Sequence, residues 1–263
     1  MKTAQRPLDL TRRRRAWFCA VLLPVLLAAN TSAADMTARE IVSKANDLLR
    51  GKTNTATATM TVVKPDWSRE VTMKTWSVEP DYAMILITDP AKDKGTVTLK
   101  RRNEVWNWIP SIQRVIKIPP SMMMQSWMGS DFTNDDLVRE SSIVEDYSQS
   151  MIGTDTVDGY ECYMINLDPN PEAGVVWGKI VMWVSKEGFL ELKAEYYDED
   201  GILVKSMIGS DVRKIGGRTL PVHWEMLPVD KPGEKTILEY SELEFDVDLK
   251  ESFFSERNMK RVR

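Results

Sequence analysis

Residues Ser121–Val138 read SMMMQSWMGSDFTNDDLV and follow a proline pair that ends the strand-like run before them. When the stretch is wound as a helix, four large apolar side chains fall on one side: Met123, Met124, Trp127 and Met128. Gly129 breaks this pattern, and Thr133 with Asp136 three residues later is typical of the cap of a second short helix. The stretch therefore predicts a helical plug, hinged at Gly129. Ordinary core packing is the alternative interpretation, because a methionine stripe usually serves packing.

The chain on either side of this plug segment, Ser121–Val138, has the signals of one helix and many strands. A capping box of Thr37 and Glu40 starts an expected helix over Met36–Leu49, and Gly51 ends it. Alternating residues separated by turn residues then indicate the strands, which are Asn54–Val63, Arg69–Trp76, Tyr82–Ile87, Thr96–Arg101, Glu104–Ile109, Ser148–Val157, Tyr160–Leu167, Lys179–Val184, Phe189–Tyr197, Leu203–Ile215, Thr219–Leu227 and Lys235–Asp246.

Two of these strands show that the expected sheet has a covered side. Phe189–Tyr197 alternates apolar with charged residues, which is typical of one wet and one covered face. In Asn54–Val63 threonines alternate with Ala56, Ala58, Met60 and Val62. A long antiparallel meander of this kind must twist and curl. If it curls without closing, the two helical segments are the available covers of its concave face.

The first 34 residues have the pattern of an export signal. Arg12–Arg15 form a basic start, Ala16–Ala29 an apolar core, and Thr31–Ala34 a small-residue cleavage region. The apolar stretch is too short for an ordinary membrane-spanning helix, so we expect cleavage after Ala33 or Ala34. Arg14 and Arg15 also resemble a twin-arginine signal, but a run of four arginines is equally well explained as a plain basic region, and we favour Sec-type export. Residues 35–263 are then expected to form one large domain.

The net charge and the number of cysteines indicate the compartment of the mature chain and the ligands that it does not favour. Removal of residues 1–34 takes away six of 35 basic and one of 39 acidic side chains, which leaves a net charge of −9. Such a protein is a poor candidate for binding nucleic acid or an anionic membrane surface. Cys162 alone remains, so no internal disulfide can form, and we interpret this residue as a buried small hydrophobe. Export without a disulfide favours a bacterial periplasm.

The residues that usually carry catalysis or metal binding are scarce. His223 is the one histidine of the chain, and one histidine with one cysteine cannot build a His/Cys metal site. Asp135 and Asp136 lie at an expected helix start, where acidic residues are favoured anyway. The methionines of the plug segment raise copper binding as an alternative, but no histidine accompanies them. We therefore predict no enzyme activity, no cofactor and no metal.

Large apolar side chains are present in excess. Seven of the nine tryptophans lie between Trp67 and Trp183, and Trp224 is a further one in the mature chain. Such side chains suit a long, flexible, apolar ligand, because methionine adapts to variable shapes and each buried methylene contributes about 0.8 kcal/mol. An acyl chain fits this description. The alternative is that these side chains fill the space themselves.

Several motifs give the chain a resemblance to a known family. A Trp-x-Trp strand (Trp106–Trp108) precedes RVIKIP (Arg114–Pro119), and the plug segment contains WMGSDFTNDDL (Trp127–Leu137). Together with the export signal and the capped first helix, these motifs resemble the LolA-like outer-membrane lipoprotein-sorting proteins, above all the branch with an MGSDFTxxDL motif. The resemblance covers nearly the whole mature chain.

The resemblance implies a mainly β (α+β) fold, which is a single, strongly curved, open antiparallel half-barrel. The N-terminal helix and the central helical plug would form a lid on its concave face. It also implies acyl chains in the cavity, no enzyme activity and no metal. In related carriers an arginine on an early strand latches the lid, but Glu79–Met84, where we would seek it, contains no arginine. Members of this branch resemble partners of RND-type exporters, so the expected cargo is a lipid or a lipoprotein.

We therefore expect a monomeric periplasmic carrier that shields acyl chains between an inner-membrane exporter, of the RND or ABC type, and an outer-membrane acceptor. A regulatory module that senses a lipid or lipoprotein is the alternative function. Gly129 is the expected lid hinge. The residues expected to bind the acyl chain are Trp106, Trp108, Met123, Met124, Trp127, Met128, Phe132, Trp183 and Trp224.

Overall fold

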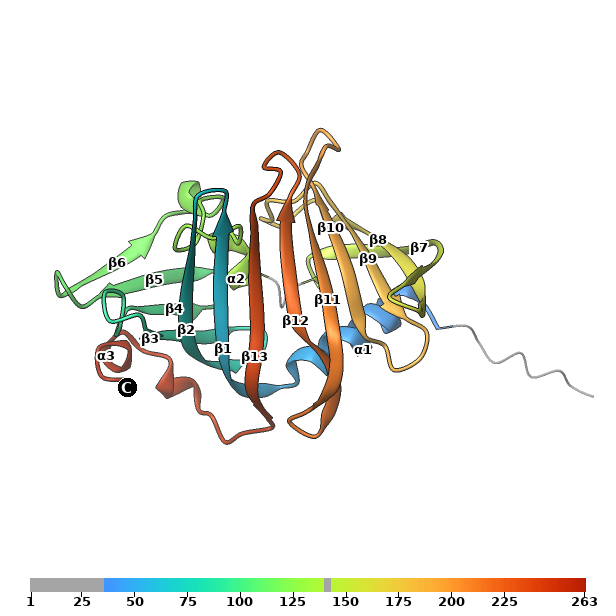
Figure 1. Ribbon diagram of the computed structural model, residues 1–263. Helices are drawn as coiled ribbons and strands as arrows, with labels where there is room; N and C mark the ends of the chain where they lie inside the picture. Colours follow the sequence, from blue (N-terminus) through green and yellow to red (C-terminus); the bar gives the residue numbers. More distant parts are fainter. Residues whose placement is uncertain (1–35, 140–142) are drawn as a thin grey trace, which may run out of the picture. The chain divides into compact units, whose positions relative to one another are not determined.

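The computed structural model describes residues 36–139 and 143–263, and these residues form one open antiparallel sheet of 13 strands (Figure 1). The strands are β1 (Thr53–Lys64), β2 (Trp67–Val78), β3 (Tyr82–Asp89), β4 (Val97–Arg101), β5 (Glu104–Ile109), β6 (Arg114–Ile118), β7 (Tyr147–Val157), β8 (Tyr160–Pro169), β9 (Lys179–Ser185), β10 (Glu191–Tyr197), β11 (Leu203–Ile215), β12 (Arg218–Pro228) and β13 (Lys235–Phe245). The helices are short, and they are α1 (Ala38–Arg50), η1 (Pro120–Met122), α2 (Asn134–Arg139), η3 (Glu251–Phe253) and α3 (Glu256–Met259). The predicted mainly β class is confirmed.

Neighbouring strands of the sheet follow the order of the sequence except at its centre. The order is β6-β5-β4-β3-β2-β1-β13-β12-β11-β10-β9-β8-β7, so the first strand pairs with the last one. Thr59, for example, lies opposite Glu239. The strands β6 and β7, which are consecutive in the chain, lie at the two opposite edges. The plug segment belongs to the connection between them, and this connection must therefore pass from one edge of the sheet to the other.

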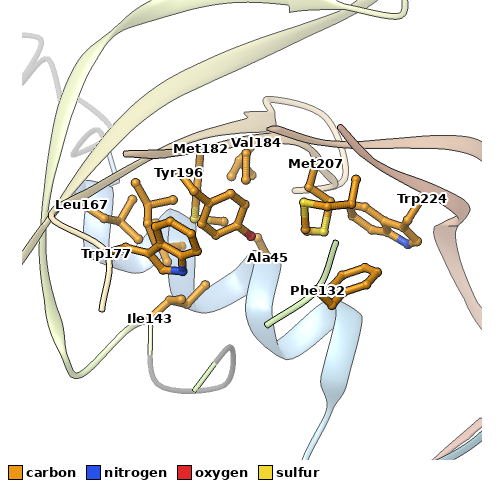
Figure 2. Close-up of a cluster of buried hydrophobic side chains, with 14 of the residues drawn as sticks. Ala45, Phe132, Ile143, Leu167, Trp177, Met182, Val184, Tyr196, Met207 and Trp224 are labelled. Atoms are coloured by element: carbon orange, nitrogen blue, oxygen red, sulfur yellow. The ribbon is translucent and has the colours of Figure 1, made fainter. Parts of the chain in front are cut away.

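The helix α1 covers one face of the sheet, which we call the inner face. It contacts β7, β9, β10 and β12, and it runs across the strands of that half of the sheet in Figure 1. Its apolar side chains Ile41, Val42 and Ala45 are buried in one cluster with strand residues such as Met182 and Trp224. Figure 2 shows Ala45 among the strand side chains of this cluster. The amphipathic pattern of the expected first helix thus places its apolar side on the sheet.

A second apolar cluster lies on the opposite, outer face of β2–β5. Successive residues of a strand point to opposite faces, so Leu99 of β4 lies on the outer face and Thr98 on the inner one. Phe254 and Met259, from the C-terminal segment, are fully buried in a cluster with Met84 and Leu99. The C-terminal segment therefore completes the core of the outer face.

The plug segment is not the helix that its apolar spacing predicts. Pro120–Met122 form a single 3-10 turn and Asn134–Arg139 a short α-helix. Residues 123–133 between them form turns and bends, with one isolated antiparallel bridge between Ser126 and Thr133. The N–H of Trp127 donates to the carbonyl of Phe132 (2.8 Å), so the chain folds back on itself as in a tight hairpin. The helical spacing of the methionines is therefore misleading, and the expected central helical lid is not confirmed.

Two sequence predictions concern the start of the chain. The export signal, residues 1–34, and its cleavage site lie outside the described residues and stay predictions. Among the residues that are described, no helix has the length and apolar composition needed to cross a membrane.

The capping box of α1 offers a first test of the fold. Thr37 accepts from the N–H of Glu40 (3.3 Å), and the Glu40 carboxylate accepts from the N–H of Thr37 (2.8 Å). Thr37→Ala removes the first bond, so the free energy of unfolding in urea should fall by about 1 kcal/mol. Asp47→Ala, at an exposed position of the same helix, is the control and should change it by less than about 0.5 kcal/mol. Equal effects of the two variants would contradict the cap.

Candidate functional site

An apolar cavity lies on the inner face over the centre of the sheet. It has a volume of about 170 Å³, which is more than ten times the roughly 10–15 Å³ that one water molecule needs. Its wall comes from both halves of the sheet, from the end of α1 and from the plug segment. The apolar side chains that line it include Ala56, Ala58, Met60, Met73, Trp127, Phe132, Met207 and Trp224.

Small and flexible side chains on the central strands leave this space open. Ala56 and Ala58 of β1 are buried on the inner face, and alanine reaches only one carbon from the backbone. Met60, Met73 and Met207 line the same wall, and methionine side chains adapt readily to irregular shapes. The wall along β1 extends from Asn54 to Met60, which corresponds to roughly 20 Å at the usual rise of a strand. An extended long acyl chain has a comparable length.

Gly209 allows Trp224 to form part of the wall. It lies on β11 directly opposite Trp224 of β12. A Cβ atom at residue 209 would come within 2.9 Å of the indole ring, so the absence of a side chain lets the ring lie over the β11 backbone. Trp224 then lies beside Met207 and Phe132 in the buried cluster (Figure 2).

The plug segment reaches the cavity through a tight turn at Met128 and Gly129. Both residues have a positive φ, 52° and 76°, which two-residue type I′ turns require. The Ser130 N–H donates to the carbonyl of Trp127 (3.0 Å). The Ser130 hydroxyl donates to the same carbonyl (2.7 Å) and accepts from the N–H of Phe132 (3.2 Å). This turn holds Trp127 and Phe132 together at the cavity, and Trp127 Nε1 donates to Thr98 Oγ1 of β4 (3.2 Å).

Two carboxylates of the MGSDFTNDD motif bind lysines on the strands, of which Lys205 is buried and Lys64 is partly buried. Lys205 of β11 pairs with Asp136, and their side chains are only 4% and 7% exposed. Lys64 of β1 pairs with Asp131 (2.9 Å) and with Glu234 (2.5 Å). Because β1 and β11 belong to different halves of the sheet, these ion pairs tie the plug segment to both halves.

The carboxylate of Asp136 has further hydrogen-bond partners. It accepts from the N–H of Thr133 (2.6 Å), and the N–H of Asp136 donates to the Thr133 hydroxyl (3.1 Å), so the predicted cap of the second short helix is confirmed. Trp177 Nε1 also donates to Asp136 (3.3 Å). The Lys205 ammonium lies over the rings of Trp177 and Tyr196, at 4.8 and 5.3 Å from their centroids. Both charges are thus paired and hydrogen-bonded, as buried charges must be.

The surroundings of Lys64 change its pKa. Burial alone would lower the pKa of Lys64, but hydrogen bonds to Glu234 and Asp131, together with their negative charges, raise it above its ordinary value. The ammonium therefore stays charged more firmly in the folded protein than in the unfolded chain.

An arginine on β2 also holds the plug segment, and it lies outside the stretch Glu79–Met84. Arg69 of β2 donates through Nη2 to the carbonyl of Met128. Its Nε atom is buried and has no hydrogen-bond partner within the described chain. Glu79–Met84, the stretch where the resemblance would place an arginine, forms the β2–β3 connection and the start of β3.

Three of the nine predicted ligand residues line the cavity, namely Trp127, Phe132 and Trp224. Trp106 and Trp108 share one face of β5, as expected, but it is the outer face. They pack in the cluster that the C-terminal segment covers, and Lys260 lies over the ring of Trp108. They therefore do not contribute to the wall of the cavity.

The other predicted residues are dispersed. Trp183 belongs to a separate cluster, and Lys193 lies 4.2 Å from the centroid of its ring. Met123 packs with Val105 of β5 in a small cluster of its own. Met124 is 50% exposed, and Met128 is partly buried.

The sequence analysis did not identify several residues of this site. They are the two lysines that pair with the plug segment, Lys64 and Lys205, and the methionines of the strands that line the cavity. For Lys205 a signal exists, because it shares its face of β11 with Met207 and Gly209, which are buried. A lysine in an apolar face needs a buried carboxylate. For Lys64, the last residue of β1, the alternation gives no comparable signal.

Breaking the Lys205–Asp136 pair should strongly destabilise the domain. Lys205→Met leaves a buried carboxylate without its cation, so the free energy of unfolding in urea should fall by roughly 3–5 kcal/mol. Adding Asp136→Asn should restore part of this loss, because the uncompensated charge is removed. The exposed pair Lys186–Glu161, whose side chains are 38% and 78% exposed, is the control, and Lys186→Met should cost less than about 1 kcal/mol. A similarly small loss for Lys205→Met would show that the Lys205–Asp136 pair does not stabilise the domain.

The raised pKa of Lys64 predicts a dependence of stability on alkaline pH. Its contribution is complete below the ordinary lysine value of 10.5 and is lost as the pH rises through the higher pKa of the folded state. The difference in free energy of unfolding between the wild type and Lys64→Met should therefore be constant near neutral pH and shrink above about pH 10.5. For the exposed Lys52→Met this difference should stay below about 0.5 kcal/mol. A Lys64→Met difference that does not shrink would contradict the ion pair.

Comparison with known proteins gives a family and a fold. Residues 79–261, more than half of the chain, match a family described as "Uncharacterized protein". A search of curated protein sequences finds no significant match.

Three solved structures share the arrangement of the whole domain. A DUF1329 family protein from Desulfovibrio piger ATCC 29098 is 25% identical, with a TM-score of 0.77 over 84% of this chain and 97% of its own. An outer membrane lipoprotein-sorting protein domain from Vibrio parahaemolyticus is 23% identical, with a TM-score of 0.76 over 85% and 98%. A LolA superfamily protein from Nitrosomonas europaea is 23% identical, with a TM-score of 0.73 over 84% and 99%. The chain thus belongs to the family of uncharacterized proteins that its sequence matches, and its fold is that of the LolA-like superfamily.

Proposed function

We propose that the chain is a periplasmic carrier that binds acyl chains of a lipid or lipoprotein in the cavity of the inner face. The observation that carries this proposal is the cavity itself, which leaves about 170 Å³ open where side chains would otherwise fill the core. Among the solved structures with this fold is an outer membrane lipoprotein-sorting protein domain, which supports a ligand of this class.

The chemistry of the wall suits a flexible hydrocarbon. Alanine, methionine and tryptophan side chains face the cavity over much of its length. Each methylene that moves from water into such a site contributes about 0.8 kcal/mol, so a long chain gains affinity without specific polar contacts. Within this proposal Trp127, Phe132 and Trp224 are the predicted ligand residues that contact the acyl chain.

The plug segment acts as the gate of this site in our proposal. Phe132 lines both the cavity and an open groove on the other side of the plug segment. Displacement of the Trp127–Phe132 turn would therefore join the two spaces and admit a longer ligand. The contacts of Asp131 with Lys64 and of Asp136 with Lys205 hold the gate closed, and Gly129 is the proposed hinge.

The proposed route runs from the inner towards the outer membrane. An inner-membrane exporter of the RND or ABC type would deliver the lipid or lipoprotein, and an outer-membrane acceptor would receive it. The export pattern of residues 1–34 supports a periplasmic location, and we propose that the carrier is a monomer.

The deciding experiment is purification of the protein from periplasm, followed by mass spectrometry of the molecules extracted from it. A carrier should yield acylated molecules and should release them to added acceptor vesicles. A sensing module should instead keep its ligand and copurify with a stable protein partner. If neither acylated molecules nor binding of a brominated fatty acid is detected, the carrier proposal is wrong.

Filling the cavity should abolish binding without damaging the fold. Ala56→Leu places three extra carbons in the open space, so affinity for a brominated fatty acid should fall at least about tenfold, measured by quenching of tryptophan fluorescence. The free energy of unfolding should change by less than about 1 kcal/mol, because the added carbons enter a void. Thr57→Leu, whose side chain points to the outer face, is the matched control and should bind normally. If Ala56→Leu binds the fatty acid as tightly as the wild type, the ligand does not bind in this cavity.

A further inference from the structure

The charge of the protein is unevenly distributed along the chain. Residues 101–118 and 248–263 together contain nine basic and four acidic side chains, whereas the rest of the mature chain has a net charge of −14. The first range holds the strands β5 and β6 at one edge of the sheet, and the second is the C-terminal segment. The negative net charge of the mature chain therefore hides a region of the opposite sign.

Contacts on the outer face bring these two ranges together. Trp108 of β5 and Val115 of β6 pack in one cluster with Val262 of the C-terminal segment. The Lys260 ammonium lies 5.6 Å from the centroid of the Trp108 ring. In Figure 1 the β5–β6 turn and α3 lie on the same side of the sheet, near the C-terminus. We call the surface that they form the basic corner, and its exposed cations are Arg114, Lys117, Lys250, Arg257, Lys260 and Arg261.

Most of these cations are not neutralised by a neighbouring carboxylate. Lys117 pairs with Glu104. Arg114, Arg257 and Arg261 form no ion pair with any other residue of the ranges 36–139 and 143–263. Their charges face solvent, where they attract anionic groups over about one Debye length, which is about 8 Å at physiological ionic strength.

An open hollow in the C-terminal segment lies among three of the cations. It has a volume of about 460 Å³, and Lys250, Arg257 and Arg261 line it together with serine and asparagine side chains. Asp248 is the one carboxylate among the described residues that line it, so the cations outnumber the acids. Arginine and lysine favour anionic groups with several acceptor oxygens, and a phosphate is such a group.

An apolar side chain lies beside the cations of the edge hairpin. Ile112, in the β5–β6 turn, is 55% exposed, and Arg114 follows it by two residues. A phospholipid surface suits both, because its headgroups attract cationic side chains and apolar side chains enter the boundary with the hydrocarbon below. Charge alone would also suit an acidic protein, so the exposed isoleucine favours the lipid surface.

We propose that the basic corner docks the protein on a membrane surface that contains anionic phospholipids, with a phosphate headgroup in the hollow lined by Arg257 and Arg261. None of the six cations of the corner lines the acyl-chain cavity, so this docking goes beyond the proposed carrier function and does not rest on it. The net charge of the mature chain predicted poor binding to such a surface. The gathering of cations on one side reverses that prediction, because the local field and not the total charge attracts the membrane.

Sedimentation with lipid vesicles tests the docking. Protein purified from periplasm is mixed with vesicles of phosphatidylcholine, either alone or with added phosphatidylglycerol, and the bound fraction gives a partition coefficient. The protein should bind only the vesicles that contain phosphatidylglycerol. High salt should abolish the binding, because the Debye length falls to about 3 Å at 1 M.

Variants of the hollow locate the docking site. Arg257→Gln combined with Arg261→Gln should lower the partition coefficient at least about tenfold, since each basic side chain near an anionic surface contributes about fivefold. Arg213→Gln combined with Lys214→Gln removes the same charge from exposed positions of β11, so this control should bind normally. Arg257→Lys combined with Arg261→Lys keeps the charge and should retain most of the binding.

The fold and the cavity are measured separately from the docking. The glutamine variant should keep the melting temperature and the affinity for a brominated fatty acid, so failure of the docking proposal leaves the carrier proposal standing, and the reverse also holds. Equal binding to both kinds of vesicle, or unchanged binding by the glutamine variant, would overturn the docking. Absence of binding to phosphatidylglycerol would overturn it as well, including the case in which the basic corner retains an acidic protein instead.

Discussion

The ion pair between Lys205 and Asp136 determines where the plug segment lies, and the rest of the site depends on that position. The connection between the two edge strands passes from one edge of the sheet to the other, and its residues Trp127 and Phe132 lie on the inner face. An unpaired carboxylate could not be buried there. A lysine on β11 provides the matching charge, and Lys64 on β1 does the same for Asp131. Together they fix a turn that has little secondary structure of its own. This explains why a motif of small and acidic residues occurs beside the largest apolar side chains of the segment.

The cavity results from what the plug segment and the strands leave unfilled. The turn brings Trp127 and Phe132 to the inner face, where they meet Trp224, and the glycine at residue 209 makes room for that indole. The alanines of β1 line the opening that remains. The same small residues that would weaken a packed core thus create a binding site. Their position at the centre of the sheet makes both halves contribute to its wall.

Local sequence patterns predicted most of the helices and strands. The features that they did not predict depend on contacts between residues far apart in the sequence. Alternation and turn residues indicated the strands, and side-chain caps indicated the starts of α1 and α2, because these signals lie within a few residues. The prediction of a helix over the methionines of the plug segment was wrong. Their apolar spacing fits a helix, but contacts with distant strands determine the path of the chain, such as the hydrogen bond from the Asp131 N–H to Thr236 on β13. Alternation showed that Trp106 and Trp108 share a face. That this is the outer face, covered by the C-terminal segment, cannot be read from any local pattern.

The pairing of β1 with β13 has a consequence for how the domain folds. These strands are separated by almost the whole described chain, yet they join the two halves of the sheet. Contacts between such distant segments are costly to form early, because a long loop must close first. The β1–β6 and β7–β12 meanders have local connections and can form independently. During synthesis the halves therefore cannot merge until the last strand has emerged, and an intermediate halted before that point would expose the edges of both β1 and β12.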